Sequence, residues 1–180
     1  NLAWMEDPVP WQLTEQYVRL ANATTTPIAT GEDIYLKENF MPLFKSGGIA
    51  VVHPDVLSAG GIMETKKIGD LAEDHGVAMA IHMAESPIAC MAAVHAAAAT
   101  RNFTALEVHS VDVPWWEDLV VGPSKPLIKD GFIAVPDTPG LGIEELNEDL
   151  IKEKSHPQFP EPWTSTEQWD AEWANDRQWS

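Results

Sequence analysis

Five polar residues follow one another at near-regular intervals, each at the end of a short apolar run. They are Glu6, Glu32, Asp55, His82 and Glu107, and successive members are 26, 23, 27 and 25 positions apart. Paired carboxylates suit a hard divalent cation such as Mg²⁺, which leaves coordination positions for water and substrate. A histidine beside a carboxylate is held in one tautomer and made more basic, as a general base requires. The set predicts a metal site combined with acid–base chemistry.

The spacing of these residues has the length of one strand, one helix and two loops. Between the runs, Leu13, Tyr17 and Leu20 share one helical face, and 62–75 and 86–99 read as helices. Ser86 and Pro87 form a strong helix start, as N-cap and first helical residue. Strands alternating with helices predict an α/β fold with a parallel sheet, either a closed barrel or an open doubly wound sheet.

In a βα barrel the carboxyl ends of the strands converge on one mouth, where active sites of this architecture lie. We therefore assign Glu6 and Glu32 to the metal, Asp55 and His82 to the base, and Glu107 to the same ring. Any one of them alone would be read as a surface or capping residue. Five at successive strand ends favour a common site.

Several motifs together resemble the mandelate racemase/muconate lactonizing enzyme branch of the enolase superfamily. The resemblance runs from residue 1 to about 150 and rests on Trp4-Met-Glu-Asp-Pro8, Gly31-Glu32, Pro54-Asp55, Gly60-Gly61, His82, Leu106-Glu107 and Val135-Pro-Asp-Thr-Pro-Gly-Leu-Gly142. It implies the C-terminal part of a (β/α)₈ TIM-type barrel, about five of its eight strands. It also implies that Glu6 and Glu32 are the second and third metal ligands, that Asp55 and His82 form the base dyad, and that Glu107 hydrogen-bonds the substrate enolate.

The same resemblance implies parts that would precede Asn1. These are a first metal ligand, an Asp on the third strand, and often a Lys-x-Lys acid/base on the second. The chain also begins with Asn directly before an apolar run. We therefore expect a fragment that is inactive by itself.

The chain divides into three predicted parts. Residues 1–120 hold the barrel units, strands 4 to 8. Residues 121–155 are predicted to contribute to a capping domain, with a hairpin over 127–135 and a short helix ending near Lys154. Residues 156–180 form a Pro- and Trp-rich tail, which we expect to pack as an arm on a partner surface.

Three further residues are candidates for substrate contacts. His53 and His109 are each two positions from a site residue, so on a strand they point to the same side. Glu85 follows His82 in the loop expected above the site. Cys90 lies in an apolar helical run and is expected to be an inert buried thiol.

Composition narrows the class of partner. With 11 basic and 28 acidic residues, the formal charge of −17 argues against nucleic acid. No stretch approaches the roughly 18 to 20 apolar residues of a membrane span. One cysteine fits a reducing compartment, so we expect a cytoplasmic protein. The tail's tryptophans need a surface to cover them, which predicts a homo-oligomer.

The predicted function is Mg²⁺-dependent removal of the proton α to a carboxylate, followed by β-elimination of water from a sugar acid. A racemase, epimerase or cycloisomerase would use the same residues and differ in the fate of the enolate. The alternative from another class is a non-catalytic βα-repeat assembly module whose acids only solvate a barrel rim.

Overall fold

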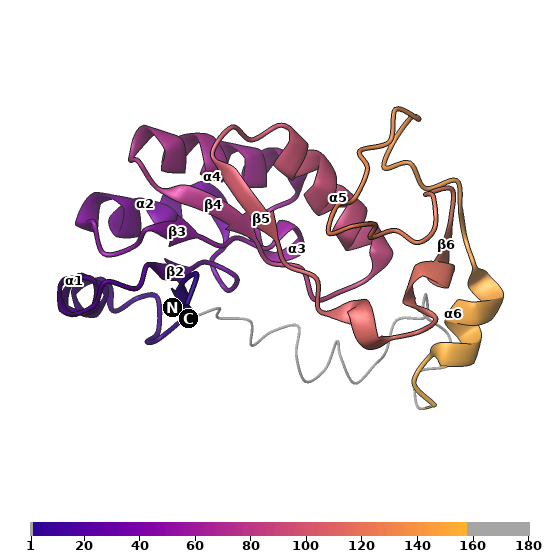
Figure 1. Cartoon of the computed structure of the whole chain (residues 1–180), viewed down its shortest axis with the longest axis horizontal. Helices are drawn as coiled ribbons and strands as arrows, with labels where there is room; N and C mark the ends of the chain where they lie inside the picture. The colour runs from indigo at the N-terminus through magenta and orange to yellow at the C-terminus, as the bar shows by residue number, and fades with distance from the viewer. Residues whose placement is uncertain (1, 158–180) are drawn as a thin grey trace, which may run out of the picture.

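The computed structural model describes residues 2–157, and its centre is a five-stranded parallel sheet (Figure 1). The strands are β1 (Met5–Glu6), β2 (Ile28–Thr30), β3 (Val51–Val52), β4 (Ala78–Ile81) and β5 (Phe103–Leu106). Their order in the sheet is β1-β2-β3-β4-β5. A doubly wound sheet reverses its order at a switch point, and this sheet has no reversal over its five strands. The α/β prediction with a parallel sheet is confirmed.

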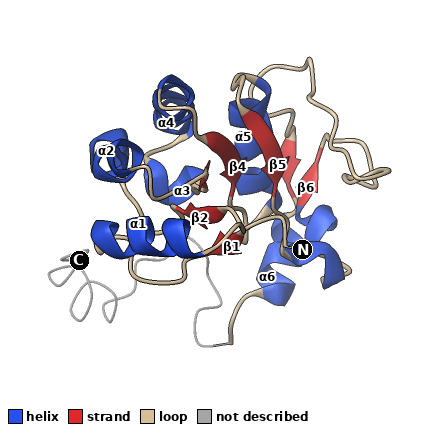
Figure 2. Cartoon of the chain, turned by 60° about the vertical axis from the view of Figure 1, so that its left-hand side comes forward, coloured by secondary structure: helices blue, strands red, loops and turns tan. Residues whose placement is uncertain are grey.

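Helices connect the strands and lie along the outside of the sheet (Figure 2). They are α1 (Thr14–Ala23), α2 (Leu36–Ser46), α3 (Val56–Ala59), α4 (Ile62–Asp74) and α5 (Pro87–Ala98). The predictions for 62–75 and 86–99 are confirmed, and Ser86 accepts a hydrogen bond from the Ala89 N–H at 3.4 Å. The helical face predicted from Leu13 is wrong in one residue. Leu13 precedes the helix as its N-cap and is exposed, whereas Tyr17 is fully buried.

The two faces of the sheet carry different side chains because successive strand residues alternate in direction. Large residues such as Ile28, Val52 and Ile81 pack with the helices in the main core. The opposite face carries smaller ones, Ala29, Val51 and Ala80, with Trp4 and Ala105 beside them. The main core therefore fixes the strands from one side only.

The chain changes character after β5. Two short 3₁₀ helices, η1 (Ser110–Asp112) and η2 (Trp116–Leu119), lead to β6 (Val120–Val121), which pairs antiparallel with β7 (Glu145–Leu146) before α6 (Glu148–Lys154). The predicted helix ending near Lys154 is confirmed.

The hairpin predicted over 127–135 is confirmed only as one antiparallel bridge, without strands. Only Lys129 and Phe132 bridge there, around a tight turn at Asp130 and Gly131, which both have positive φ. Phe132 is 77% exposed, and the antiparallel pairing does not extend beyond this bridge. The antiparallel pair is β6–β7, which is too short to show alternation in the sequence.

A second core joins the C-terminal segment to the barrel part. Met83, Cys90, Met91 and Val94 pack there with Trp116, and Leu127 completes the buried set. Burial raises the pKa of the Cys90 thiol to about 12, in keeping with the predicted inert thiol. Within residues 2–157, no helix has the length and apolar character to cross a membrane.

Candidate active site

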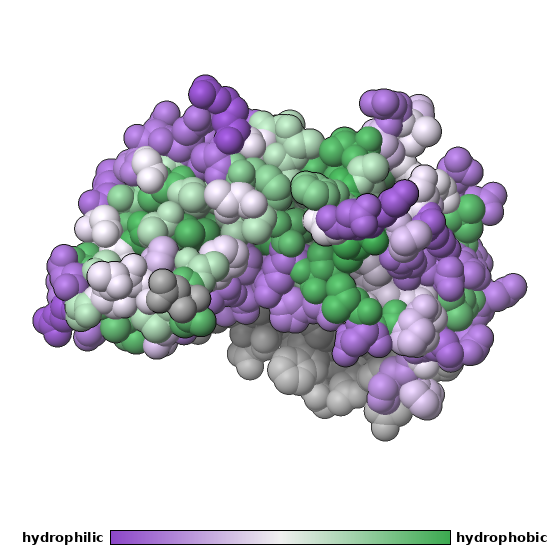
Figure 3. Space-filling view, viewed as in Figure 1, coloured by the Kyte–Doolittle hydropathy of each residue, from purple (hydrophilic) through white to green (hydrophobic). Residues whose placement is uncertain are grey.

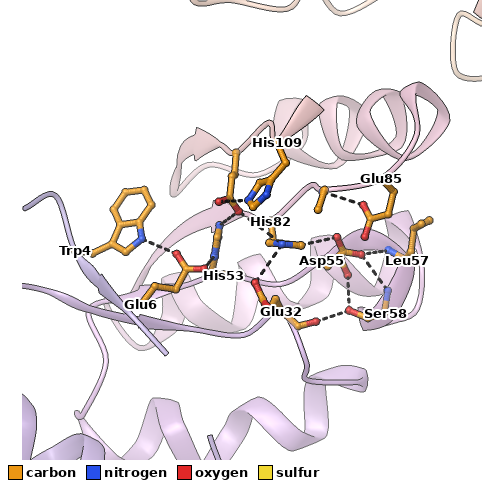
Figure 4. Close-up of polar contacts among 12 residues, drawn as sticks. Trp4, Glu6, Glu32, His53, Asp55, Leu57, Ser58, His82, Glu85 and His109 are labelled. Atoms are coloured by element: carbon orange, nitrogen blue, oxygen red, sulfur yellow. Dashed lines mark hydrogen bonds and ion pairs between the residues drawn. The ribbon is translucent and has the colours of Figure 1, made fainter. Parts of the chain in front are cut away.

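The five predicted residues converge at the carboxyl ends of the strands. Figure 4 shows Glu6, Glu32, Asp55 and His82 gathered there, and Glu107 Oε2 lies 3.8 Å from His82 Nε2. Main-chain hydrogen bonds continue between neighbouring chain segments beyond the strands. The His82 N–H donates to the Pro54 carbonyl at 3.1 Å, and the Glu107 N–H donates to the Ile81 carbonyl at 2.9 Å. These bonds fix the positions of His82 and Glu107 along the strand direction relative to the neighbouring segments.

Asp55 is the anchor of the site. Its Oδ1 accepts hydrogen bonds from the Leu57 N–H at 2.7 Å and the Ser58 N–H at 3.2 Å, so it caps α3. Its Oδ2 lies 2.9 Å from His82 Nδ1. Asp55 is only 4% exposed, and a buried carboxylate is stable only when it is paired and hydrogen-bonded. The cap therefore aims the second oxygen at the imidazole.

His82 presents its other nitrogen to two more carboxylates. Nε2 lies 3.1 Å from Glu32 Oε2 and 3.8 Å from Glu107 Oε2. Burial lowers the pKa of His82, but the hydrogen bond to Asp55 and the charges of Glu32 and Glu107 outweigh it, so the pKa is raised above 6.5. With Asp55 accepting from Nδ1–H, the neutral ring has a free lone pair on Nε2 that can take a proton.

Glu6, Glu32 and His53 form a compact group of possible ligands. One donor atom from each lies within 4.8 Å of the others. Burial raises the pKa of Glu32; His82 lowers it, and the charges of Asp7, Asp33 and Glu6 raise it further. A cation would relieve this repulsion, and carboxylate oxygens are the donors that Mg²⁺ prefers. The residues present therefore fit such an ion.

Gly31 determines where Glu32 stands. A Cβ at this position would lie 2.8 Å from the His53 carbonyl carbon and 2.9 Å from its nitrogen. Its φ of +152° is also one that side-chain-bearing residues rarely adopt. Only glycine lets the chain pass this close to β3 and then deliver Glu32 to the site.

His53 lies deeper than predicted, between Glu6 and Glu107. Its Nδ1 is 3.0 Å from Glu6 Oε1 and its Nε2 is 3.5 Å from Glu107 Oε2, yet neither nitrogen forms a well-directed hydrogen bond. The ring is 1% exposed. It is thus a buried link between two site carboxylates.

The other two candidates occupy different surroundings. His109 Nε2 lies 2.7 Å from Glu107 Oε1 on the exposed side of the site. The Glu85 carboxyl lies beside Asp55 and His82, with one polar atom of each within 4.8 Å of the others. Substrate contact by these residues stays a prediction.

Sequence reasoning missed two contributors. Trp4 Nε1 donates to Glu6 Oε2 at 2.9 Å, and Trp116 Nε1 donates to the Glu85 carbonyl at 2.8 Å. The first could have been suspected, because Trp4 is two residues from Glu6 on the same strand face. The second joins residues 31 apart and has no local signal.

Comparison with known protein families gives a clear match. The model of the family described as enolase C-terminal domain-like matches residues 1–150. The chain belongs to this family. The predicted resemblance is thereby confirmed.

Curated relatives of this enolase-type domain include sugar-acid dehydratases. The chain is 41% identical over 140 residues to a D-xylonate dehydratase of Haloferax volcanii, covering 78% of this chain and 34% of the relative. It is 37% identical over 177 residues to a D-galactonate dehydratase of Verminephrobacter eiseniae, covering 94% and 46%. The chain therefore spans between a third and a half of the length of these relatives.

Solved structures agree with the family assignment. A mandelate racemase/muconate lactonizing enzyme-like protein from Rubrobacter xylanophilus superposes with a TM-score of 0.82 at 39% identity, over 86% of this chain and 39% of that one. The 3,6-anhydro-D-galactonate cycloisomerase from Zobellia galactanivorans gives 0.75 at 33% identity, over 85% and 42%.

Proposed function

We propose that this domain forms the C-terminal part of a (β/α)₈-barrel enzyme that dehydrates a sugar acid with the help of Mg²⁺. The observation that carries the proposal is His82, held by Asp55 on one nitrogen and facing Glu32 and Glu107 with the other. The dehydratase relatives support the substrate class.

In the proposed reaction, neutral His82 Nε2 removes the proton α to the substrate carboxylate. Asp55 stabilises the imidazolium that forms, because it already accepts from Nδ1–H. Glu107 hydrogen-bonds the enolate. The β-hydroxyl leaves as water when His82 returns the proton to it, and tautomerisation of the enol gives a 2-keto-3-deoxy acid. When bound by Glu6 and Glu32, Mg²⁺ would supply electrostatic stabilisation of the developing negative charge.

The barrel itself is part of the proposal. The outer edges of β1 and β5 pair with no strand of the described part of the chain. A groove of about 530 Å³ lies beside β5, lined by residues of α5, β5 and the turn at 128–135. Figure 3 shows hydrophobic residues gathered on this side. We expect the remaining strands of a longer protein to pair with these edges, and 121–155 to join a capping domain.

The test uses the longer protein that contains this chain. It is incubated in D₂O with Mg²⁺ and a panel of aldonic and aldaric acids that includes D-xylonate and D-galactonate. Proton NMR follows exchange at the α-carbon and formation of the keto-deoxy acid. We expect both with at least one acid, and neither with His82→Asn. His75→Asn, at the other end of the strands, is the matched control. The absence of α-proton exchange with every acid of the panel would contradict the proposal.

Two alternatives have distinct signatures. A cycloisomerase, which the Zobellia relative favours, or a racemase would exchange the α-proton without releasing water. A non-catalytic assembly module would keep its Mg²⁺ affinity after Glu6→Gln and Glu32→Gln together, whereas the enzyme would lose it.

A further inference from the structure

The carboxylate of Asp55 has room for one more hydrogen bond. A carboxylate offers about four acceptor positions. Oδ1 already accepts from Leu57 and Ser58, and Oδ2 accepts from His82. Because Asp55 is buried, the remaining position on Oδ2 can accept a hydrogen bond from a neighbouring protein group.

Glu85 is the carboxyl side chain beside Asp55 and His82: one polar atom of each of the three residues lies within 4.8 Å of the others. Figure 4 shows it beside Asp55, on the far side from Glu6. Burial raises the pKa of Glu85 and the negative charge of Asp55 raises it further, whereas the Ala84 N–H and His82 lower it, so that the net shift is upward. A raised pKa means that the carboxyl binds a proton more readily, and the protonated form has an O–H to donate.

The loop that carries Glu85 is fixed from the C-terminal segment. The Glu85 carbonyl accepts hydrogen bonds from Trp116 Nε1–H at 2.8 Å and from the Ser110 hydroxyl at 3.4 Å. Its carboxylate accepts from the Ala84 N–H at 3.1 Å. Trp116 is 6% exposed and packs against Met83, the residue that follows His82. Glu85 is therefore anchored at both its main chain and its side chain.

From these contacts we propose that Glu85 is a positioning residue for the base: its carboxyl donates a hydrogen bond to Asp55 and holds Oδ2 on His82 Nδ1, while Trp116 holds the loop. Glu85 acts through Asp55 and does not touch the reacting atoms. The inference rests on the proposed function only in taking His82 as the base.

The test compares Glu85→Gln with Glu85→Ala in the longer protein. A Gln amide still donates to Asp55 and accepts from Ala84, whereas Ala does neither. The first readout is the His82 Nδ1 proton, observed by NMR of ¹⁵N-histidine-labelled protein and assigned by its loss in His82→Asn. The second is kcat and KM with the best acid of the panel.

We expect Ala to abolish the protected Nδ1 proton and to lower kcat about tenfold to a hundredfold, as loss of an orienting partner does, with little change in KM. Glu85→Gln should retain most of the protection of the Nδ1 proton and most of the parent kcat. Glu73→Ala is the matched control, because that half-buried acid contacts Arg101 away from the site. It should change neither readout.

Two results would overturn the proposal. One is an Ala variant that keeps the Nδ1 proton and kcat. The other is a Gln variant as impaired as Ala, which would mean that the negative charge matters and not the donor. If the Ala variant fails to fold, Trp116→Phe decides, because it keeps the ring and removes the N–H. Faster exchange of the Nδ1 proton is expected, and unchanged exchange contradicts the idea. The NMR readout needs no substrate, so it is independent of failure of the dehydratase proposal.

Discussion

His82 Nε2 lies 3.1 Å from Glu32 Oε2, so the proposed base and a proposed metal ligand are in direct contact. The charge of Glu32 is one of the causes that raise the pKa of His82. A cation bound to Glu32 would neutralise that charge. Metal binding and basicity at this site are therefore coupled.

The first prediction follows from this coupling. Saturating Mg²⁺ should lower the pKa of His82, because the cation removes the stabilisation that Glu32 gives to the imidazolium. NMR titration of the labelled histidines measures the shift, with His75 as internal control. In Glu32→Gln the pKa should start lower and should not respond to Mg²⁺. An unchanged response in that variant would mean that the cation binds elsewhere.

The second prediction concerns Asp55→Asn. Since Asn also caps helices, the variant can keep α3 through its amide oxygen, but it removes the charge beside His82 and replaces the acceptor of Nδ1–H by an amide NH₂. The pKa of His82 should fall, and the acid limb of the rate–pH profile should move to lower pH while the maximum rate drops. In the control variant Glu73→Gln, the acid limb of the rate–pH profile should not move.

Stability gives the third prediction, through the same histidine. A folded-state pKa raised above 6.5 means that His82 stabilises the fold below pH 6.5 and loses this contribution as pH rises through the folded-state pKa. Asp55→Asn should therefore destabilise the protein more at pH 5 than at pH 8, as measured by urea unfolding. Equal losses at both pH values would contradict a charge effect. Asp55→Ala should cost about 1 kcal/mol more at either pH, because it also removes the cap.

The sequence predicted the strand-end residues well because a parallel βα array repeats its geometry with each unit. Glu6, Glu32, Asp55, His82 and Glu107 each end a run, and the main-chain pairing of neighbouring segments carries them to one edge. The pairing of Asp55 with His82 followed from the same regularity, since they end adjacent strands.

The features that escaped prediction depend on contacts between distant segments. Glu85 lies beside Asp55 in a loop whose carbonyl Trp116 holds, and no periodicity links two residues 31 apart. His53 is buried by groups from other strands, Trp4, Glu6 and Glu107. The pair β6–β7 has two residues in each strand, which is too few for an alternating pattern to appear.

The fourth prediction tests the backbone approach at Gly31. Gly31→Ala places a Cβ against the His53 main chain and should destabilise the protein by about 1 to 3 kcal/mol, as overpacking does. It should also displace Glu32 and weaken Mg²⁺ binding. Gly76→Ala is the matched control, because Gly76 also has positive φ (+70°) but has no atom within 4 Å of the added Cβ. Gly76→Ala should also be destabilised by backbone strain, but it should keep the Mg²⁺ affinity. Calorimetry measures both the stability and the Mg²⁺ affinity of each variant.

The fifth prediction concerns the tryptophan behind the metal ligand. Trp4 Nε1–H donates to Glu6 Oε2 at 2.9 Å, and the indole also meets the His53 ring edge-on, with centroids 6.1 Å apart. Trp4→Phe keeps an aromatic ring for the second contact and removes the hydrogen bond, so Glu6 loses its orientation. Mg²⁺ affinity should fall about tenfold, the lower end of what loss of a ligand's hydrogen-bond partner costs. Trp115→Phe, whose indole lies under Lys154 away from the site, should leave the affinity unchanged. If both variants bind Mg²⁺ like the parent, Glu6 does not depend on Trp4 for its position.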